Sequence, residues 1–194
     1  MTFDAFFRLA VQTVTRPREV AALLVSLDLS REALLTAFAL VIVLNTLFFG
    51  MTQLVVPDGS LLMPVMQDPV MFGVSLSLTL GALIFALTAC GRAFQGVADL
   101  SQMALLIIWM QALRAVLQAV VLLLAPVSLF LSGVLVTAAT VVGIWILVHF
   151  IDVAHGIGSL LKAGVVLLLA VVGMMLALTM IFSLLGVSPS GGAL

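Results

Sequence analysis

Gln111, Arg114 and Gln118 are polar residues inside an otherwise apolar stretch, residues 107–126, which reads IIWMQALRAVLQAVVLLLAP. Their spacing of i, i+3 and i+7 places them on one face of an α-helix. If the stretch crosses a membrane, Arg114 lies near the bilayer midplane, where a central arginine costs about 2.5–3.5 kcal/mol on insertion scales. The sequence therefore predicts that this face is directed into the protein rather than toward lipid tails.

Two roles are open to Arg114. The sequence offers no acidic residue at the same depth, and the best candidate partner is Asn45, with Thr137 and Thr140 as others. As a structural group, the guanidinium would hydrogen-bond several helices. As a functional group, it would line a cavity and bind an anion or a lipid phosphate. The first candidate site is thus an intramembrane polar cluster, made of Asn45, Gln111, Arg114 and Gln118.

A second polar cluster stands in the segment HFIDVAHG, where His149, Asp152 and His155 are spaced i, i+3 and i+6. On a helix they lie within about a third of the circumference. Imidazole and carboxylate are ligands for zinc, but i, i+6 spacing is poor for two ligands of one ion and no fourth ligand is evident. A hydrogen-bonded His–Asp pair at the cytoplasmic rim is the preferred interpretation, with a metal site and a proton relay as alternatives. We predict no bound metal and no cofactor.

The composition identifies the solvent in which these residues must function. Of 194 residues, 64% are hydrophobic and only 8% are charged, whereas a typical soluble domain is about 45–50% apolar and about 25% charged. So few charges cannot cover a water-soluble fold of this size, so the chain is predicted to be an integral membrane protein. The net charge of −1 gives no indication of a nucleic-acid partner, and the single cysteine, Cys90, excludes an internal disulfide.

An all-α, polytopic fold with five transmembrane helices follows from the apolar runs, because each run has about the 20 residues that a spanning helix needs. The predicted transmembrane domain covers residues 33–186, preceded by residues 1–32 and followed by a short C-terminal tail, residues 187–194. The five predicted spans are about 33–55, 71–91, 101–125, 128–151 and 160–186.

The basic residues predict the orientation of these spans. Of the seven Lys and Arg residues, all except Arg114 fall before the first span or in alternate loops, on one side of the membrane. The other loops and the tail have none. The N-terminus is therefore predicted to be cytoplasmic and the C-terminus periplasmic.

Residues 1–32 are predicted to form short amphipathic helices rather than a span. Apolar side chains recur at helical spacing, and Asp4, Arg8, Gln12 and Thr13 take the other side. Such a helix suits the headgroup region of a bilayer. Packing on the cytoplasmic ends of the spans, binding to the membrane surface and docking of a partner are all open. The apolar side consists of Phe3, Phe6, Phe7, Ala10, Val11 and Val14.

Three patches of the sequence resemble the Yip1 family of membrane proteins, in its bacterial form. They are RPREVAALLVSLDLSREALLTAFALVIVLN, GRAFQGVADLSQMALLIIWMQALRAVLQ and HFIDVAHGIGSLLKA. The resemblance implies a five-span architecture with a cytoplasmic amphipathic N-terminus and a non-enzymatic role. Eukaryotic members bind Rab GTPases and support vesicle traffic. This sequence has neither their long cytoplasmic N-terminal region nor their Asp-Leu-Tyr-Gly-Pro-like motif, so Rab binding is not carried over.

Two functions remain open at the level of sequence. In the preferred one, the chain is a non-enzymatic scaffold or membrane-organising, trafficking-like factor of the bacterial inner membrane, in contact with lipids and with partner helices in a homo- or hetero-oligomer. In the alternative, it is a small transporter or channel component with an anion or lipid path lined by the Arg114 face. An enzyme is not expected, because the sequence contains neither HExxH nor GxSxG.

Overall fold

The structure, a computed structural model, describes residues 3–55 and 68–184. Within these ranges the chain is all-helical, as predicted, and five of its helices are long and apolar enough to cross a membrane. The chain is thus a multi-pass membrane protein in its architecture. The seven helices of the described ranges are α1 (Phe3–Thr15), α2 (Pro17–Val25), α3 (Arg31–Val55), α4 (Pro69–Ala93), α5 (Leu100–Leu124), α6 (Leu129–His155) and α7 (Leu160–Leu184).

The five predicted spans correspond to α3 through α7. The largest difference is at the end of α6, which continues four residues past the predicted boundary at 151. It ends only where Gly156 adopts a left-handed conformation, with φ of 63°, which glycine enters without steric cost. The predicted tail at residues 187–194 lies outside the described ranges.

Side-chain caps set the first residues of three spanning helices. Oδ1 of Asp68 accepts a hydrogen bond from the backbone N–H of Val70 at 2.7 Å, at the start of α4. At the start of α5, Asp99 and Gln102 form a capping box, and Ser128 accepts from the N–H of Leu131 before α6. These side chains satisfy backbone donors that have no partner within the helix.

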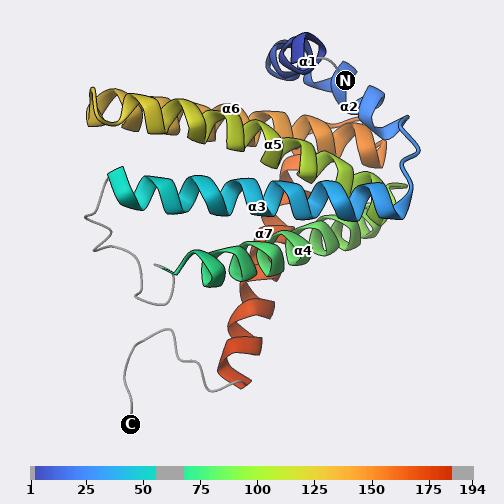
Figure 1. The fold of residues 1–194 in the computed structure, drawn as a ribbon. Helices are drawn as coiled ribbons and strands as arrows, with labels where there is room; N and C mark the ends of the chain where they lie inside the picture. Colours follow the sequence, from blue (N-terminus) through green and yellow to red (C-terminus); the bar gives the residue numbers. More distant parts are fainter. Residues whose placement is uncertain (1–2, 56–67, 185–194) are drawn as a thin grey trace.

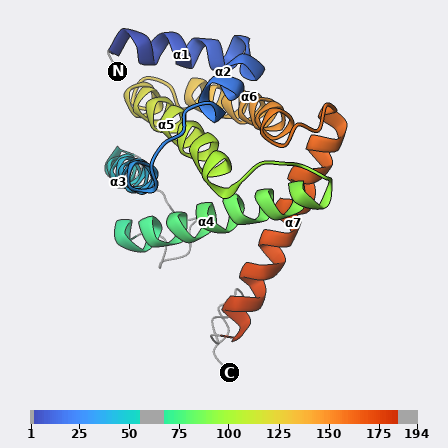
Figure 2. The same ribbon diagram turned by 90° about the vertical axis from the view of Figure 1, so that its right-hand side faces the viewer.

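Helix α5 is the most buried of the five long helices. It packs against α2, α3, α4 and α6, and Met103, Leu106 and Ile107 on it belong to the apolar core. Figure 1 shows α3, α4, α5 and α6 running alongside one another, whereas α7 crosses them and its C-terminal half extends beyond them. Figure 2 shows α1 lying across the α5–α6 side of the assembly.

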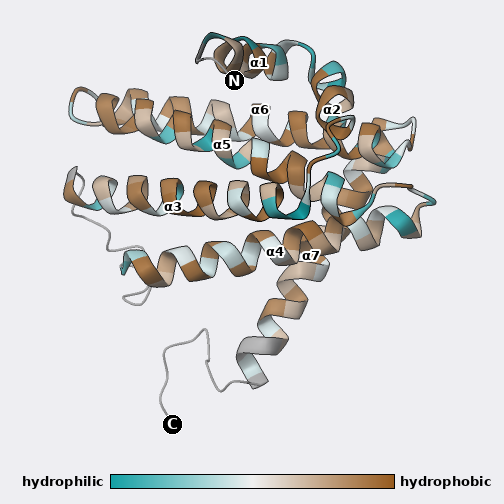
Figure 3. Ribbon diagram, turned by 45° about the vertical axis from the view of Figure 1, so that its right-hand side comes forward, coloured by the Kyte–Doolittle hydropathy of each residue, from teal (hydrophilic) through white to brown (hydrophobic). Residues whose placement is uncertain are grey.

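Apolar side chains cover much of the outer surface of the long helices, including Leu40, Leu123 and Phe130. In Figure 3 the hydrophobic colour runs along these helices, and hydrophilic segments are frequent around α2 and the helix ends near it. Such a continuous apolar exterior suits lipid rather than water.

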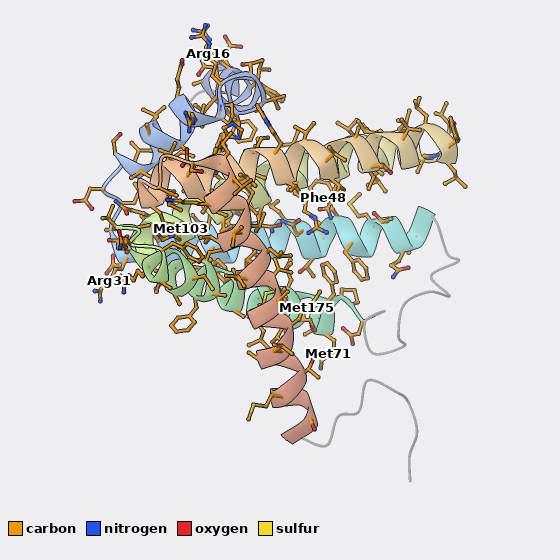
Figure 4. The ribbon with its side chains drawn as sticks, turned by 180° about the vertical axis from the view of Figure 1, so that it is seen from behind. Arg16, Arg31, Phe48, Met71, Met103 and Met175 are labelled. Atoms are coloured by element: carbon orange, nitrogen blue, oxygen red, sulfur yellow. The ribbon has the colours of Figure 1, made fainter. Side chains whose placement is uncertain are left out.

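Three segments that are far apart in the sequence meet at one end of the spans. The Arg18 side chain of α2 forms an ion pair with Asp152 near the end of α6. The N–H of Val97, in the α4–α5 connection, donates to the carbonyl of His155 at 3.2 Å. In Figure 4, Arg31 and Met103 lie together toward this end, whereas Met71 lies away from it.

Candidate functional site

Asn45 connects α3 to α5 deep within the protein. Its side chain is only 1% exposed, and its Nδ2 donates to the carbonyl of Val41 at 2.7 Å and to that of Gln111 at 3.4 Å. Asn45 was predicted as a partner of Arg114 on the third span, and its side chain does reach that helix, α5. Its contact there is the backbone of Gln111, however, and not the guanidinium of Arg114.

Arg114 itself is exposed, so the prediction that it is directed into the protein was wrong. Gln111 and Gln118 lie only about 20° apart around the helix, whereas Arg114 lies about 60° from Gln111, at the edge of the shared face. The packing of α3 on α5 half-buries Gln111 and Gln118 but does not cover Arg114, at the edge of this face. Across the described ranges, Arg114 has no hydrogen-bond or ion-pair partner.

The two threonines considered as partners of Arg114 are also exposed. The hydroxyl of Thr137 donates to the carbonyl of Gly133 at 2.9 Å, and that of Thr140 donates to the carbonyl of Val136 at 2.8 Å. Both hydroxyls are thus bonded within their own helix, α6.

Helices α3 and α5 also carry buried polar atoms without a hydrogen-bond partner in the described part of the chain. A buried polar atom left unpaired costs about 1–3 kcal/mol, so these atoms require water or a ligand from outside the chain. The unpartnered atoms are Asn45 Oδ1, Thr46 Oγ1, Gln53 Nε2, Gln111 Oε1 and Gln118 Oε1. Thr46 lies beside Gly73 of α4, so we call Asn45, Gln111, Arg114 and Gln118 alone the α3–α5 polar row.

The second predicted cluster does not form a His–Asp pair. Asp152 is 3% exposed and pairs with Arg18, whose side chain is 56% exposed. Its Oδ1 also accepts from the N–H of Ser159 at 2.9 Å, just before α7. One carboxylate therefore joins α2, α6 and the start of α7. The sequence did not reveal this, because Arg18 and Asp152 are 134 positions apart.

Neither histidine is bonded to Asp152. Nδ1 of His149 lies 2.8 Å from the carbonyl of Trp145, and the two rings are 4.5 Å apart. His155 is 1% exposed, and its ring lies against Gly91, near the end of α4, and against Gly96, in the α4–α5 connection. A Cβ atom at Gly91 would be 2.1 Å from the ring, and one at Gly96 would be 2.4 Å from Nδ1. The two glycines thus form a socket for the imidazole.

The chemistry available at this end is structural. Within residues 3–55 and 68–184, His, Cys, Asp and Glu side chains do not come together in any group of three or more that could hold a metal ion. Asp152 is used by Arg18 and Ser159, and His155 fills the socket. We call this group the α2–α6–α7 junction, made of Arg18, Gly91, Gly96, Asp152, His155 and Ser159.

Helix α1 is attached to α5 by a buried hydrogen bond. Nε1 of Trp109 donates to Oγ1 of Thr13 at 3.0 Å, and this hydroxyl donates in turn to the carbonyl of Leu9 at 2.8 Å. Phe6 packs on the Trp109 ring, with centroids 5.4 Å apart. The prediction that Thr13 lies on the polar side of the helix was therefore wrong, because its hydroxyl satisfies the indole N–H of a membrane span.

The exposed surface of α1 falls into two sectors. Phe7, Val11 and Val14 form an exposed apolar sector, and Val11 is 63% exposed. A separate, buried sector of the helix, which includes Leu9 and Thr13, packs against the rest of the protein. At 100° per residue, the three sectors are separated by roughly a third of a turn each. The polar exposed sector consists of Asp4, Arg8, Gln12 and Thr15.

Comparisons of the chain with protein-family models, with curated proteins and with solved structures found no match. The resemblance to the Yip1 family thus stays a prediction from the three sequence patches.

Proposed function

We propose that the chain is a non-enzymatic scaffold that organises the bacterial inner membrane, related to the Yip1 family, and that α1 is its membrane-shaping element. The observation that carries the proposal is the three-sector surface of α1. A helix with protein on one side, apolar residues on the second and polar residues on the third fits the boundary between acyl chains and headgroups, beside a transmembrane domain.

The attachment of α1 and α2 makes this element rigid. The Trp109–Thr13 hydrogen bond holds α1 on α5, and the Arg18–Asp152 pair holds α2 on α6. An apolar strip held at a constant depth occupies area in one leaflet only. Such a one-sided insertion favours curvature toward that leaflet, and it marks a membrane position to which partner proteins and lipids can bind.

The α2–α6–α7 junction supports the relationship to the Yip1 family. Each of the three resembling patches supplies a part of it: Arg18 comes from the first, Gly91 and Gly96 from the second, and Asp152 and His155 from the third. The three patches that resemble the family thus meet at one junction of the fold.

The distribution of charge supports a cytoplasmic N-terminus. Arg16, Arg18 and Arg31 belong to segments that meet the junction end, and Arg92 and Lys162 lie next to it in the chain. In this orientation, the apolar sector of α1 enters the cytoplasmic leaflet.

The depth of α1 tests the geometry. In a Cys90→Ser background, we would attach a nitroxide spin label at Val11→Cys or at Gln12→Cys and reconstitute the full chain in vesicles. Accessibility to oxygen and to a water-soluble nickel complex then reports depth. We expect the Val11 label in the acyl region and the Gln12 label in water. Equal accessibility at the two neighbouring positions would refute an interfacial α1.

The membrane-organising role has its own test. Full-length protein with Val11→Ser and Val14→Ser would be compared with wild type in vesicles of phosphatidylethanolamine and phosphatidylglycerol, by electron microscopy. Gln12→Ser and Thr15→Ser together form the matched control on the polar sector. We expect wild type and control to narrow or tubulate vesicles and the Val11, Val14 variant to lose this effect. Identical vesicle shapes for all three proteins would contradict the proposal.

A further inference from the structure

The α3–α5 polar row combines a permanent cation with buried polar atoms that the described chain does not satisfy. Arg114 is exposed without a partner, and Asn45 is buried with its Oδ1 free of hydrogen bonds. Gln111 and Gln118 also each have a buried, unpartnered Oε1. In Figure 4, nitrogen and oxygen atoms are visible near Phe48, midway along α3.

The charge of this site is unbalanced. The ion pairs of the described residues join Arg16 to Glu19 and Arg18 to Asp152, so neither involves Arg114. Arg114 stands in the middle of α5, 14 residues after Leu100 and 10 before Leu124. An arginine at this depth is stabilised when the bilayer thins locally and admits water and headgroups. The group best placed to meet it is therefore an oxyanion.

The side chains of the row define the oxyanion further. A guanidinium binds phosphate oxygens through two parallel N–H donors. The amides of Gln111 and Gln118 can each rotate to present an NH₂ group in place of the unpartnered oxygen. Asn45 cannot do so without losing its bonds to the carbonyls of Val41 and Gln111. Its Oδ1 must therefore accept a hydrogen bond, from a hydroxyl, an ammonium or a water.

We propose that the α3–α5 polar row is a binding site for a phosphate group, held by Arg114 with Gln111 and Gln118, together with a hydrogen-bond donor that is held by Asn45. Phosphatidylglycerol and phosphatidylethanolamine supply both groups in one headgroup, and inorganic phosphate with water supplies the same chemistry. This site is separate from α1, and its existence does not depend on the membrane-organising role.

The test uses the delipidated full-length protein in detergent. Thermal unfolding is followed during titration with short-chain phosphatidylglycerol, with the corresponding diacylglycerol, which lacks phosphate, and with inorganic phosphate. The variants are Arg114→Gln and Arg114→Lys. Arg31→Gln is the matched control, because Arg31 is also an exposed arginine but is the first residue of α3, away from the polar row. A ligand that binds the folded state raises its unfolding temperature.

We expect wild type and Arg31→Gln to be stabilised by phosphatidylglycerol and not by diacylglycerol. Arg114→Gln should bind at least about tenfold more weakly, because it loses the two charge-assisted hydrogen bonds of a guanidinium to phosphate, and Arg114→Lys should lie between. Stabilisation by inorganic phosphate, and its competition with the lipid, would identify a free anion as the source; without competition, the source is the lipid headgroup.

Three results would overturn the proposal: equal binding by wild type and Arg114→Gln, stabilisation by diacylglycerol as strong as by the phospholipid, or no stabilisation by either phosphate ligand. If Arg114→Gln does not fold, Gln118→Leu replaces it, and unchanged phosphate binding in that variant counts against the site. If Arg114→Gln instead dissociates an oligomer in light scattering and wild type binds no phosphate, the occupant is a second protein chain and the proposal fails.

Discussion

Replacing Gly91 with alanine is the most direct test of the α2–α6–α7 junction. The added Cβ would lie 2.1 Å from both Cε1 and Nε2 of His155 and 2.5 Å from its Nδ1. The ring cannot retreat easily, because Gly96 also lies against it, and a Cβ there would lie 2.4 Å from Nδ1. The side chain of His155 is also almost fully buried. The clash must therefore move either the ring into its neighbours or α4 away from α6.

The expected cost follows from two opposing terms. Overpacking a well-filled interior costs about 1–3 kcal/mol, whereas Gly→Ala within a helix gains about 0.5–1 kcal/mol. Gly81 isolates the second term, because it is an exposed glycine of the same helix and a Cβ there meets nothing within 4 Å. We expect Gly91→Ala to be about 1–3 kcal/mol less stable than Gly81→Ala, or roughly 2–10 °C in unfolding temperature for a chain of this size.

The assay is thermal unfolding of the full-length protein in detergent, followed by circular dichroism. A His155→Ala background provides the decisive comparison, because removal of the ring leaves room for the new methyl group. Gly91→Ala should then cost little beyond His155→Ala alone, since the two positions are in contact and their effects are not additive. The reasoning is refuted if Gly91→Ala unfolds together with Gly81→Ala, or if its cost is the same with and without the ring.

Two further predictions test how the N-terminal helices are attached. Thr13→Val leaves the buried indole N–H of Trp109 without an acceptor and should lower the free energy of unfolding by about 1–3 kcal/mol. Thr15→Val, the control at an exposed hydroxyl of the same helix, should change the free energy of unfolding by less than about 0.5 kcal/mol. A larger loss at Thr15 than at Thr13 would contradict the docking of α1. Asp152→Asn and Arg18→Gln, singly and together, should show a coupling of about 1 kcal/mol, because the pair is buried at one side chain and half-exposed at the other. Strictly additive losses in the double-mutant cycle would show that the ion pair does not hold α2.

The sequence predicted the helices well because they depend on local properties. The length and apolar character of each run indicate a spanning helix. The end of α6 was predicted too early, at 151, although Gly156 ends this helix through its own local conformation. The predicted neighbourhood of Asn45 and Gln111 is seen in a contact between their helices, but that contact is with the backbone carbonyl of Gln111 and not with its amide.

The polar contacts themselves were predicted less well. Helical spacing shows which residues share a face, but it does not show how much of that face a neighbouring helix covers. Arg114 therefore appeared to face inward, whereas it lies at an uncovered edge. In the same way, His149, Asp152 and His155 appeared to form one cluster, although each has a different environment from a different helix or turn.

The sequence by itself determined that the chain has five helices apolar enough to cross a membrane, where these helices lie to within a few residues, and which polar residues must be explained. Only the tertiary structure decided which groups meet: Asp152 with Arg18, His155 with Gly91 and Gly96, and Trp109 with Thr13. The physical reason is range. Hydropathy and capping act within one helix, whereas these contacts join positions far apart in the chain, and they form only when the helices have packed.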